Sequence, residues 1–348
     1  MKIAIDKQSV LVEKRKGNEY VYLYDNESYQ DLKNTELHCL RHDLCNYVDV
    51  NLTTYDIDCL KKTTMDDPNY DQLPNKVNYK IGIIIPNYNY EHTIEKCLTS
   101  IFNQTYTNYE IIFVDDCSTD NSVQVAENLY SDLLLTDGEF GTLKIIKLKQ
   151  KRLNGGARNE AYLHLSDDVD YVWYVDSDDW LIDENVLQKI NDRLQKNPDV
   201  LFVGIIQNKR GELKNPSIPT YINKYQAAYS WSGSCGKVIK KSLATRQECL
   251  YNEGTLMEDR NQHAKICFYM NSFALLKEPV YVWNRDNTKS VTTIRDKVQW
   301  GTSVIRNYAD TLQFYLSIKG RDRLFDEMME KRLKQCKEEM LNESDGQY

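Results

Sequence analysis

An apolar stretch that ends in a cluster of carboxylates constrains this chain more than any other feature of its sequence. The run 171–175 is built from aromatic and β-branched residues. Asp176, Asp178 and Asp179 follow it directly. Because a buried carboxylate without a partner is very costly, we predict a strand whose carboxyl end meets a hard divalent cation that also holds phosphate. The alternative is an acidic turn before a helix, with Asp179 or Asp183 as the cap.

The composition is that of a soluble globular protein rather than a disordered one. Hydrophobic residues make up 41% of the 348 residues, and the net charge of -8 argues against broad electrostatic binding to nucleic acid or an anionic membrane. The beginning of the chain lacks the apolar core of a signal peptide, and no apolar run approaches the length of a bilayer-spanning helix. A cytoplasmic protein without a membrane span is therefore expected.

The nine cysteines contain no CxxC pair, which argues against a secreted disulfide framework. One segment, His38-Cys39-x-x-His42-x-x-Cys45, has a spacing that suggests part of a zinc site. Adjacent His38 and Cys39 would point in different directions on a helix, however, and no second paired half follows. We expect ordinary packing of these side chains.

Three regions are expected along the chain. Residues 1–78 form an N-terminal extension of unknown role, in which two β-rich runs flank 16–19 as in a hairpin. Residues 79–295 form one α/β domain. Residues 296–348 form a charged helical segment, and this segment or the N-terminal extension is expected to govern acceptor choice or oligomerisation.

From residue 79 onward, buried strands alternate with amphipathic helices. This repetition predicts a mainly parallel, Rossmann-like sheet with helices on both faces, in which ligands bind beyond the carboxyl ends of the strands. Proline at 86 is expected to end the first strand, because proline cannot donate to a sheet ladder. The expected strands are 80–86, 109–115, 143–148, 171–175 and 200–206, and the expected helices include 94–101, 157–165 and 184–195.

Four polar motifs follow the expected strands: Pro-Asn-Tyr-Asn at 86–89, Val-Asp-Asp-Cys-Ser-Thr-Asp at 114–120, Asn-Gly-Gly-Ala-Arg-Asn at 154–159 and Asp-Ser-Asp-Asp at 176–179. Their order on this scaffold resembles the family 2 glycosyltransferases of the GT-A fold. The resemblance covers residues 80–293 and implies transfer of a sugar from a nucleotide-sugar donor with inversion.

The resemblance implies a donor site at the strand ends. Asp116 would bind the polar edge of the nucleotide base, and Pro86 and Tyr88 would line the same cleft. Asn154 and Arg158 would lie near a helix start that favours phosphate, where Arg158 either reaches a phosphate or orients the aspartates. The spacing after Asn154 is shorter than in most relatives. Tyr88 as a turn aromatic and Arg158 in a helix-end salt bridge are the structural alternatives.

The Asp176-Ser-Asp178 sequence matches the DxD motif of the same family. Asp178 would be the most direct ligand of Mn²⁺ or Mg²⁺, and Asp176 would hold the metal or the ribose. Such an ion would neutralise the charge that builds on the leaving nucleoside diphosphate.

A later motif, Glu258-Asp259 before a helical run, resembles the Glu-Asp motif of the family. Asp259 would be the general base that takes the proton of the acceptor hydroxyl, with Glu258 in a supporting role. Helix capping is the alternative for Asp259. Trp231 would stack on a sugar or pack in the core, and Arg285 and Ser290 would contact the diphosphate or have ordinary surface roles.

These signals predict a metal-dependent inverting glycosyltransferase that uses a nucleoside-diphosphate sugar, taken to be a UDP-sugar. The Gln-x-x-Arg-Trp motif of processive synthases is absent from the sequence, so transfer of one or a few sugars is expected. The alternatives are a nucleotidyltransferase, or a degenerate domain that binds carbohydrate or serves as a scaffold. The acceptor is left open between a glycan, a lipid-linked intermediate, a polymer and a protein, with modified nucleic acid less favoured.

Overall fold

The computed structural model describes residues 2–5, 10–15, 18–23, 77–136, 138–221, 223–230, 233–287 and 297–344. The segment with zinc-like spacing at 38–45, Trp231 and Ser290 lie outside these residues, so the predictions for them remain predictions. Among the described helices, none combines the length and the apolar composition needed to cross a bilayer.

The N-terminal strands form a small antiparallel sheet of their own. β1 (Lys2–Ile5) pairs with β2 (Val10–Arg15), which pairs with β3 (Asn18–Leu23). Arg15 lies opposite Asn18, so the predicted hairpin around 16–19 is confirmed.

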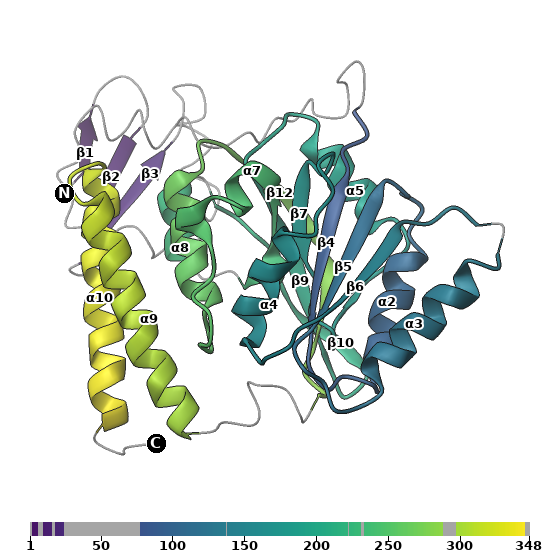
Figure 1. Ribbon diagram of the computed structural model, residues 1–348. Coiled ribbons are helices and arrows are strands. Elements are labelled where there is room, and N and C mark those ends of the chain that lie inside the picture. The colour runs from purple at the N-terminus through teal and green to yellow at the C-terminus, as the bar shows by residue number, and fades with distance from the viewer. Residues whose placement is uncertain are drawn as a thin grey trace.

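A nine-stranded sheet forms the centre of the main domain (Figure 1). One half is entirely parallel, in the order β6-β5-β4-β7, as the alternation of strands and helices predicts. These strands are β4 (Ile81–Asn87), β5 (Tyr109–Asp115), β6 (Thr142–Lys147) and β7 (Tyr171–Tyr174).

The other half of the sheet is mixed. β11 (Lys237–Lys240) runs antiparallel between β7 and β9 (Val200–Lys209), and β9 pairs in parallel with β12 (Phe273–Asn284). The short β8 (Trp180–Leu181) and β10 (Glu212–Ser217) add antiparallel edges. Because β11 is antiparallel to β7, the first residue of β11 lies at the same end of the sheet as the carboxyl end of β7.

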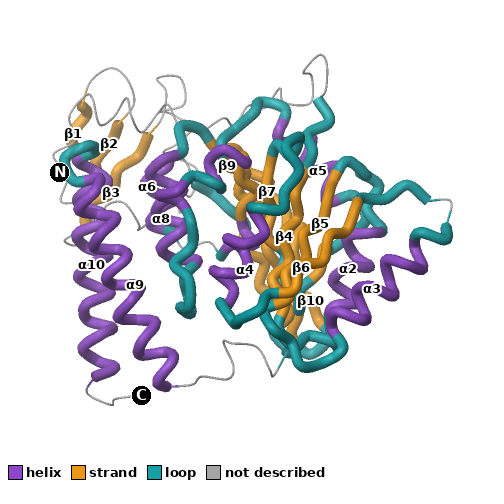
Figure 2. Tube along the Cα trace, in the orientation of Figure 1, coloured by secondary structure: helices purple, strands orange, loops and turns teal. Residues whose placement is uncertain are grey.

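Helices cover both faces of the sheet, as predicted (Figure 2). One face of the sheet is covered by α2 (Ile94–Phe102), α3 (Ser122–Leu133) and α5 (Val186–Leu194). The other face is covered by α4 (Leu153–Tyr162) and α8 (Asp259–Tyr269). Burial of each large aliphatic side chain in these layers contributes about 1.5–3 kcal/mol.

Two long helices lie beyond α8. α9 (Lys297–Ile318) and α10 (Arg323–Ser344) pack against each other, and their apolar residues join the core layer that contains α4 and α8. α6 (Lys224–Tyr229) and α7 (Lys241–Ala244) complete this side. The helical C-terminal segment expected from the sequence is therefore confirmed, and it is part of the domain core.

Pro86 lies inside β4 and does not end it, so this detail of the sequence analysis is wrong. Pairing of β4 with β7 ends at Ile84 opposite Tyr174, so at Pro86 there is no β7 residue that needs a backbone donor. On the other side Pro86 lies opposite Val114 of β5. A proline is tolerated in a strand where one side of the ladder has already ended.

Candidate active site

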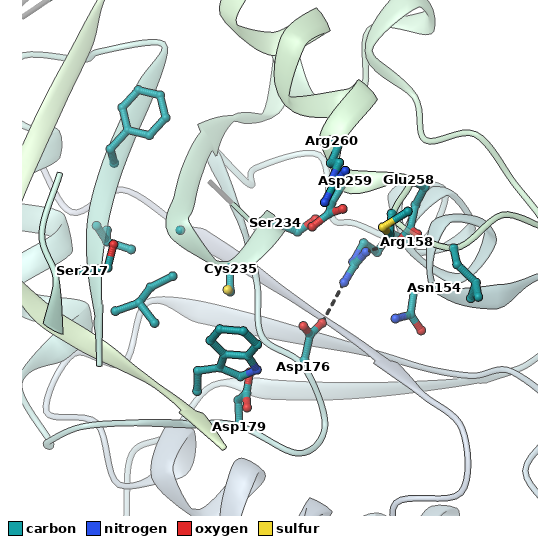
Figure 3. A pocket seen from close by; sticks show the side chains of 18 of the residues that line it. Asn154, Arg158, Asp176, Asp179, Ser217, Ser234, Cys235, Glu258, Asp259 and Arg260 are labelled. Carbon is teal, nitrogen blue, oxygen red and sulfur yellow. Dashed lines mark hydrogen bonds and ion pairs between the residues drawn. The ribbon is translucent and has the colours of Figure 1, made fainter. Parts of the chain in front are cut away.

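A cavity of about 730 Å³ lies beyond the carboxyl end of β7 (Figure 3). Its walls come from the start of α4, the loop after β7, strands β9, β10 and β12, the start of α8, and α9. A volume of this size is ordinary for a small-molecule site. Five residues with a predicted site role line it, together with Asp179 of the carboxylate cluster: Asn154, Arg158, Asp176, Glu258 and Asp259.

The guanidinium of Arg158 joins two of these carboxylates. Its Nη2 donates to Asp176 Oδ1 at 2.8 Å and its Nη1 to Glu258 Oε1 at 2.7 Å. Arg158 is only 3% exposed. Burial alone would lower its pKa, but the negative charges of Asp176, Glu258 and Asp259 outweigh burial and hold the pKa of Arg158 well above its ordinary value. Of the predicted roles, orientation of the acidic residues is the one seen in these contacts.

Two glycines precede Arg158 at the start of α4, and the first of them allows a close approach to another segment. Both Gly155 and Gly156 lie within the helix, which begins at Leu153 and so starts earlier than predicted. A Cβ on Gly155 would lie 2.9 Å from Glu258 Cγ and 3.0 Å from the carbonyl oxygen of Asn252. The glycine therefore lets α4 approach the segment before α8 closely enough for Arg158 to reach Glu258.

Glu258 and Asp259 stand at the beginning of α8. Burial raises the pKa of Glu258 to about 7, with Arg158 acting in the lowering direction and Asp259 in the raising direction. Glu258 thus changes protonation near neutral pH. Asp259 lies in the first turn of α8 and lines the cavity (Figure 3). The helix N-cap is Glu258, and it makes no side-chain cap hydrogen bond.

Asp179 serves the structure of the acidic loop. Its Oδ2 accepts from the Tyr281 hydroxyl at 2.5 Å and its Oδ1 from the backbone N–H of Asn284 at 2.8 Å. It is 2% exposed, and burial, together with Asp178 and Asp176, raises its pKa well above the ordinary value. Both oxygens are bound to β12, so Asp179 anchors the loop to this strand and caps no helix.

Asp176 and Asp178 are the residues of the acidic loop that could hold a metal ion. Asp176 is 32% exposed, and Asp178 Oδ2 accepts from Asn287 Nδ2 at 2.7 Å. Burial, and then the charge of Asp176, raises the pKa of Asp178 to about 6. No group of three or more described His, Cys, Asp or Glu residues is arranged to hold a metal by itself. Two carboxylates are the protein share that Mg²⁺ usually takes when phosphates and water complete its shell.

The residues expected at the nucleotide base do not line this cavity. Asp116 is 3% exposed, and its two oxygens accept from the backbone N–H groups of Arg152 at 2.6 Å and Leu153 at 2.8 Å. It thereby fixes the start of α4. Tyr88 carries the ammonium of Lys151 over its ring, 3.3 Å from the centroid. Pairing of β4 with β5 places the ends of these two strands side by side.

Two other predicted residues differ in their relation to the cavity. Asn154 is exposed and lines it. Arg285 is exposed and does not line it, and its guanidinium lies 4.4 Å from the ring centroid of Trp283. Contact of Arg285 with a diphosphate stays a prediction.

The far wall of the cavity contains residues to which the sequence analysis assigned no site role. Trp283 comes from β12, Tyr221 from the segment after β10, and Trp300 from α9 in the C-terminal segment. Gln207 and Ser217 add polar groups from β9 and β10. Aromatic faces beside a few polar groups are typical of pockets for small polar ligands. No motif marks Trp300, because its place at the cavity depends on the packing of α9.

Comparison with known proteins identifies the family. The model of glycosyl transferase family 2 matches residues 82–281, which is more than half of the chain. The chain belongs to glycosyl transferase family 2. The match includes the acidic loop at 176–179, Arg158 and the Glu258-Asp259 pair.

Relatives of this family 2 chain include glycosyltransferase GlyA of Streptococcus pneumoniae, 26% identical over 228 residues that make up 60% of this chain and 31% of GlyA. The Escherichia coli protein WfgD, named a UDP-Glc:alpha-D-GlcNAc-diphosphoundecaprenol beta-1,3-glucosyltransferase, is 32% identical over 126 residues, 36% of this chain and 45% of WfgD. The chain thus spans less than half the length of both relatives.

The fold has solved counterparts. The structure of S. aureus TarS 1-349 in complex with UDP-GlcNAc superposes with a TM-score of 0.56 at 20% identity, covering 76% of this chain and 72% of that one. At this identity the likeness concerns the fold alone. The predicted GT-A fold is confirmed.

Proposed function

We propose that this family 2 protein is a metal-dependent, inverting and non-processive glycosyltransferase that moves a sugar from a UDP-sugar to an acceptor hydroxyl in the cytoplasm. One observation carries the proposal: Asp176 and Asp259 line the same cavity, and the chain Asp176–Arg158–Glu258 connects the two sides. A donor group and a base must meet in one space for a single displacement.

On the donor side, Asp176 and Asp178 are the residues that would hold Mn²⁺ or Mg²⁺. Such an ion would neutralise charge on the diphosphate of the donor. Arg158 bonds Asp176 and orients it from behind. Asp116 and Tyr88, at the ends of the neighbouring strands, would receive the nucleotide base, with Asp116 keeping its present bonds to the start of α4.

On the acceptor side, Asp259 takes the proton of the acceptor hydroxyl. The oxygen then bonds to the anomeric carbon while the bond from that carbon to the diphosphate breaks, and UDP leaves with the electron pair. A single displacement of this kind inverts the anomeric configuration and forms no covalent sugar–enzyme intermediate. A positioned general base contributes about 10²–10⁴-fold to the rate.

The donor nucleotide is proposed from the relatives. WfgD is named for UDP-Glc, and TarS was solved with UDP-GlcNAc. The sugar and the acceptor are not part of the proposal.

The test is thermal stabilisation by UDP, GDP, CMP and dTDP, each with and without Mn²⁺. We expect a Mn²⁺-dependent shift with UDP in the wild type that is lost in Asp178→Ala. Asp183→Ala is the matched control, because Asp183 bonds Asn185 and Lys189 outside the cavity. It should keep the shift. Equal shifts in all three proteins with and without metal would contradict the metal assignment, and stabilisation by UDP without any UDP release from UDP-sugars would contradict the enzyme.

A further inference from the structure

Helix α9 of the C-terminal segment builds part of the cavity wall. Trp300 and Val304, one turn apart on α9, both line the cavity. The hydroxyl of Ser303 between them accepts from the backbone N–H of Leu256 at 2.9 Å, and Leu256 lines the cavity as well. Leu256 comes shortly before Asp259 in the chain. The wall that α9 contributes therefore adjoins the acceptor side of the proposed reaction.

Buried polar contacts fix α9 in this place. The side-chain amide of Asn307 donates to the carbonyl oxygen of Leu256 at 2.7 Å, and the hydroxyl of Thr311 donates to Asn261 Oδ1 of α8 at 2.6 Å. Thr311 is only 2% exposed. Because a buried polar group that loses its partner costs about 1–3 kcal/mol, such bonds allow little movement of the helix. The packed core thus positions α9 and its Trp300.

A second tryptophan lines the cavity beside the acidic loop. Trp283 of β12 directly precedes Asn284, whose backbone N–H donates to Asp179 Oδ1 at 2.8 Å. In the register of the sheet Trp283 lies opposite Gln207 of β9, which also lines the cavity. Trp283 therefore adjoins the donor side of the site, whereas Trp300 adjoins the side of the proposed base.

The polar groups of the far wall are neutral. Gln207, Asn215 and Ser217 line the cavity from β9 and β10 with amides and a hydroxyl. Among the described lining residues the cations are Arg158 and Arg260, and Arg158 bonds Asp176 and Glu258. Recognition of a phosphate-bearing acceptor typically uses several arginine or lysine donors. The described part of the wall contains no such cluster.

A sugar ring matches this wall. One face of a pyranose carries C–H groups that can pack on the flat face of an indole, and the hydroxyls around its edge bond amides and hydroxyls. Trp300 is half-buried, so part of its side chain remains accessible. The alternative is that Trp300 only completes the packing of α9. That role does not require it to lie at the cavity beside neutral hydrogen-bonding groups.

We infer that the acceptor presents an uncharged sugar ring and that this ring stacks on Trp300. The inference rests on the proposed function, because the stacked sugar supplies the hydroxyl from which Asp259 takes the proton. Trp283 and Trp300 both lie beyond residues 82–281, which the family model matches. The assignment therefore uses features of this chain outside the family match.

The test measures release of UDP from UDP-glucose and from UDP-N-acetylglucosamine. The acceptor probes are the methyl glycosides of glucose, galactose and N-acetylglucosamine, and ribitol 5-phosphate as a charged acceptor without a ring. At least one glycoside should raise UDP release above hydrolysis by water, and ribitol 5-phosphate should not. Trp300→Ala should raise the KM of that glycoside about tenfold, with less effect on the KM of the UDP-sugar. Trp300→Phe, which keeps a flat ring, should raise it less.

Tyr308→Ala is the matched control. Tyr308 is a half-buried aromatic residue of α9 that packs against the core and does not line the cavity. Its replacement should lower Tm and leave the KM of the glycoside near that of the wild type. An equal rise of this KM in Tyr308→Ala and Trp300→Ala would show that Trp300 acts through the packing of α9, and the inference would be wrong. A rise confined to the KM of the UDP-sugar would assign Trp300 to the donor and also overturn it.

Two outcomes need separate readouts. If Trp300→Ala does not fold, Trp300→Leu replaces it, because leucine keeps apolar volume without a flat ring; an unchanged KM of the glycoside in Trp300→Leu overturns the inference. If the wild type releases no UDP from either UDP-sugar, the proposed function fails by itself. Saturation-transfer difference NMR with the methyl glycosides then decides: signals seen with the wild type should be lost in Trp300→Leu and kept in Tyr308→Ala. Binding of ribitol 5-phosphate alone, or of none of the probes, would overturn the inference.

Discussion

Arg158 and Asp176 are joined by a hydrogen bond of 2.8 Å that fastens the loop after β7 to helix α4. The same guanidinium holds Glu258, one hundred positions further along the chain, through its other terminal nitrogen. A single buried side chain thus links the acidic loop after β7 to the Glu258-Asp259 pair.

Replacing Arg158 with Met should be strongly destabilising, because it leaves Glu258 and Asp176 without their cation. Removing one partner from a buried ion pair costs about 3–5 kcal/mol of the free energy of unfolding. Arg152→Ala is the control, because Arg152 is 26% exposed and pairs with Glu160 and Glu253 near the surface. That change should cost about 0–1 kcal/mol. Urea unfolding measures both, and equal losses would contradict the role of Arg158.

Asp259→Asn should lower transfer by about 10²–10⁴-fold, because Asn cannot accept the proton of the acceptor. Binding of UDP in the presence of Mn²⁺ should stay near that of the wild type, since the predicted nucleotide contacts lie elsewhere. Initial rates and isothermal titration measure the two quantities. The adjacent Glu258→Gln, which can still accept from Arg158, should lose less activity than Asp259→Asn; the reverse order would move the role of base to Glu258.

The raised pKa of Glu258 predicts a pH dependence of stability. The folded-state pKa is about 7, against an ordinary value of 4.5, so between these pH values the folded protein binds a proton that the unfolded chain does not. Protonation of Glu258 therefore stabilises the fold fully below about pH 4.5, and this contribution is lost as pH rises through 7. Relative to Glu258→Gln, the wild type should lose free energy of unfolding between pH 5 and 8. Parallel curves for the two proteins would show that Glu258 titrates normally.

Gly155→Ala should push α4 away from the segment before α8. The new Cβ would meet Glu258 Cγ at 2.9 Å and the carbonyl oxygen of Asn252 at 3.0 Å. Such overpacking lowers the free energy of unfolding by about 1–3 kcal/mol. Activity should fall as well, because Arg158 is moved out of hydrogen-bond distance of Glu258. Gly301→Ala in α9 is the control, since nothing lies within 4 Å of a Cβ there. That change should stabilise by about 0.5–1 kcal/mol, as in any open helix position; chemical denaturation measures both.

Local patterns were sufficient for the elements that hold the site. Strand β5 spans 109–115 as predicted, because five of its seven residues are apolar or half-apolar and leave few alternatives. The boundaries that differed have local causes that a pattern does not contain. The first strand continues through Pro86 because its neighbour has already ended, and α4 starts early because Asp116 binds its first N–H groups.

The sequence by itself determined the order of strands and helices, the carboxylates after β7 and the Glu258-Asp259 pair, because periodicity and motif spacing are local properties of the chain. Only the tertiary structure decided that Arg158 binds Asp176 and Glu258, and that Trp300 of α9 reaches the cavity. These contacts join segments distant in the chain. Their partners are chosen by how the sheet and helices pack, and packing depends on every layer at once.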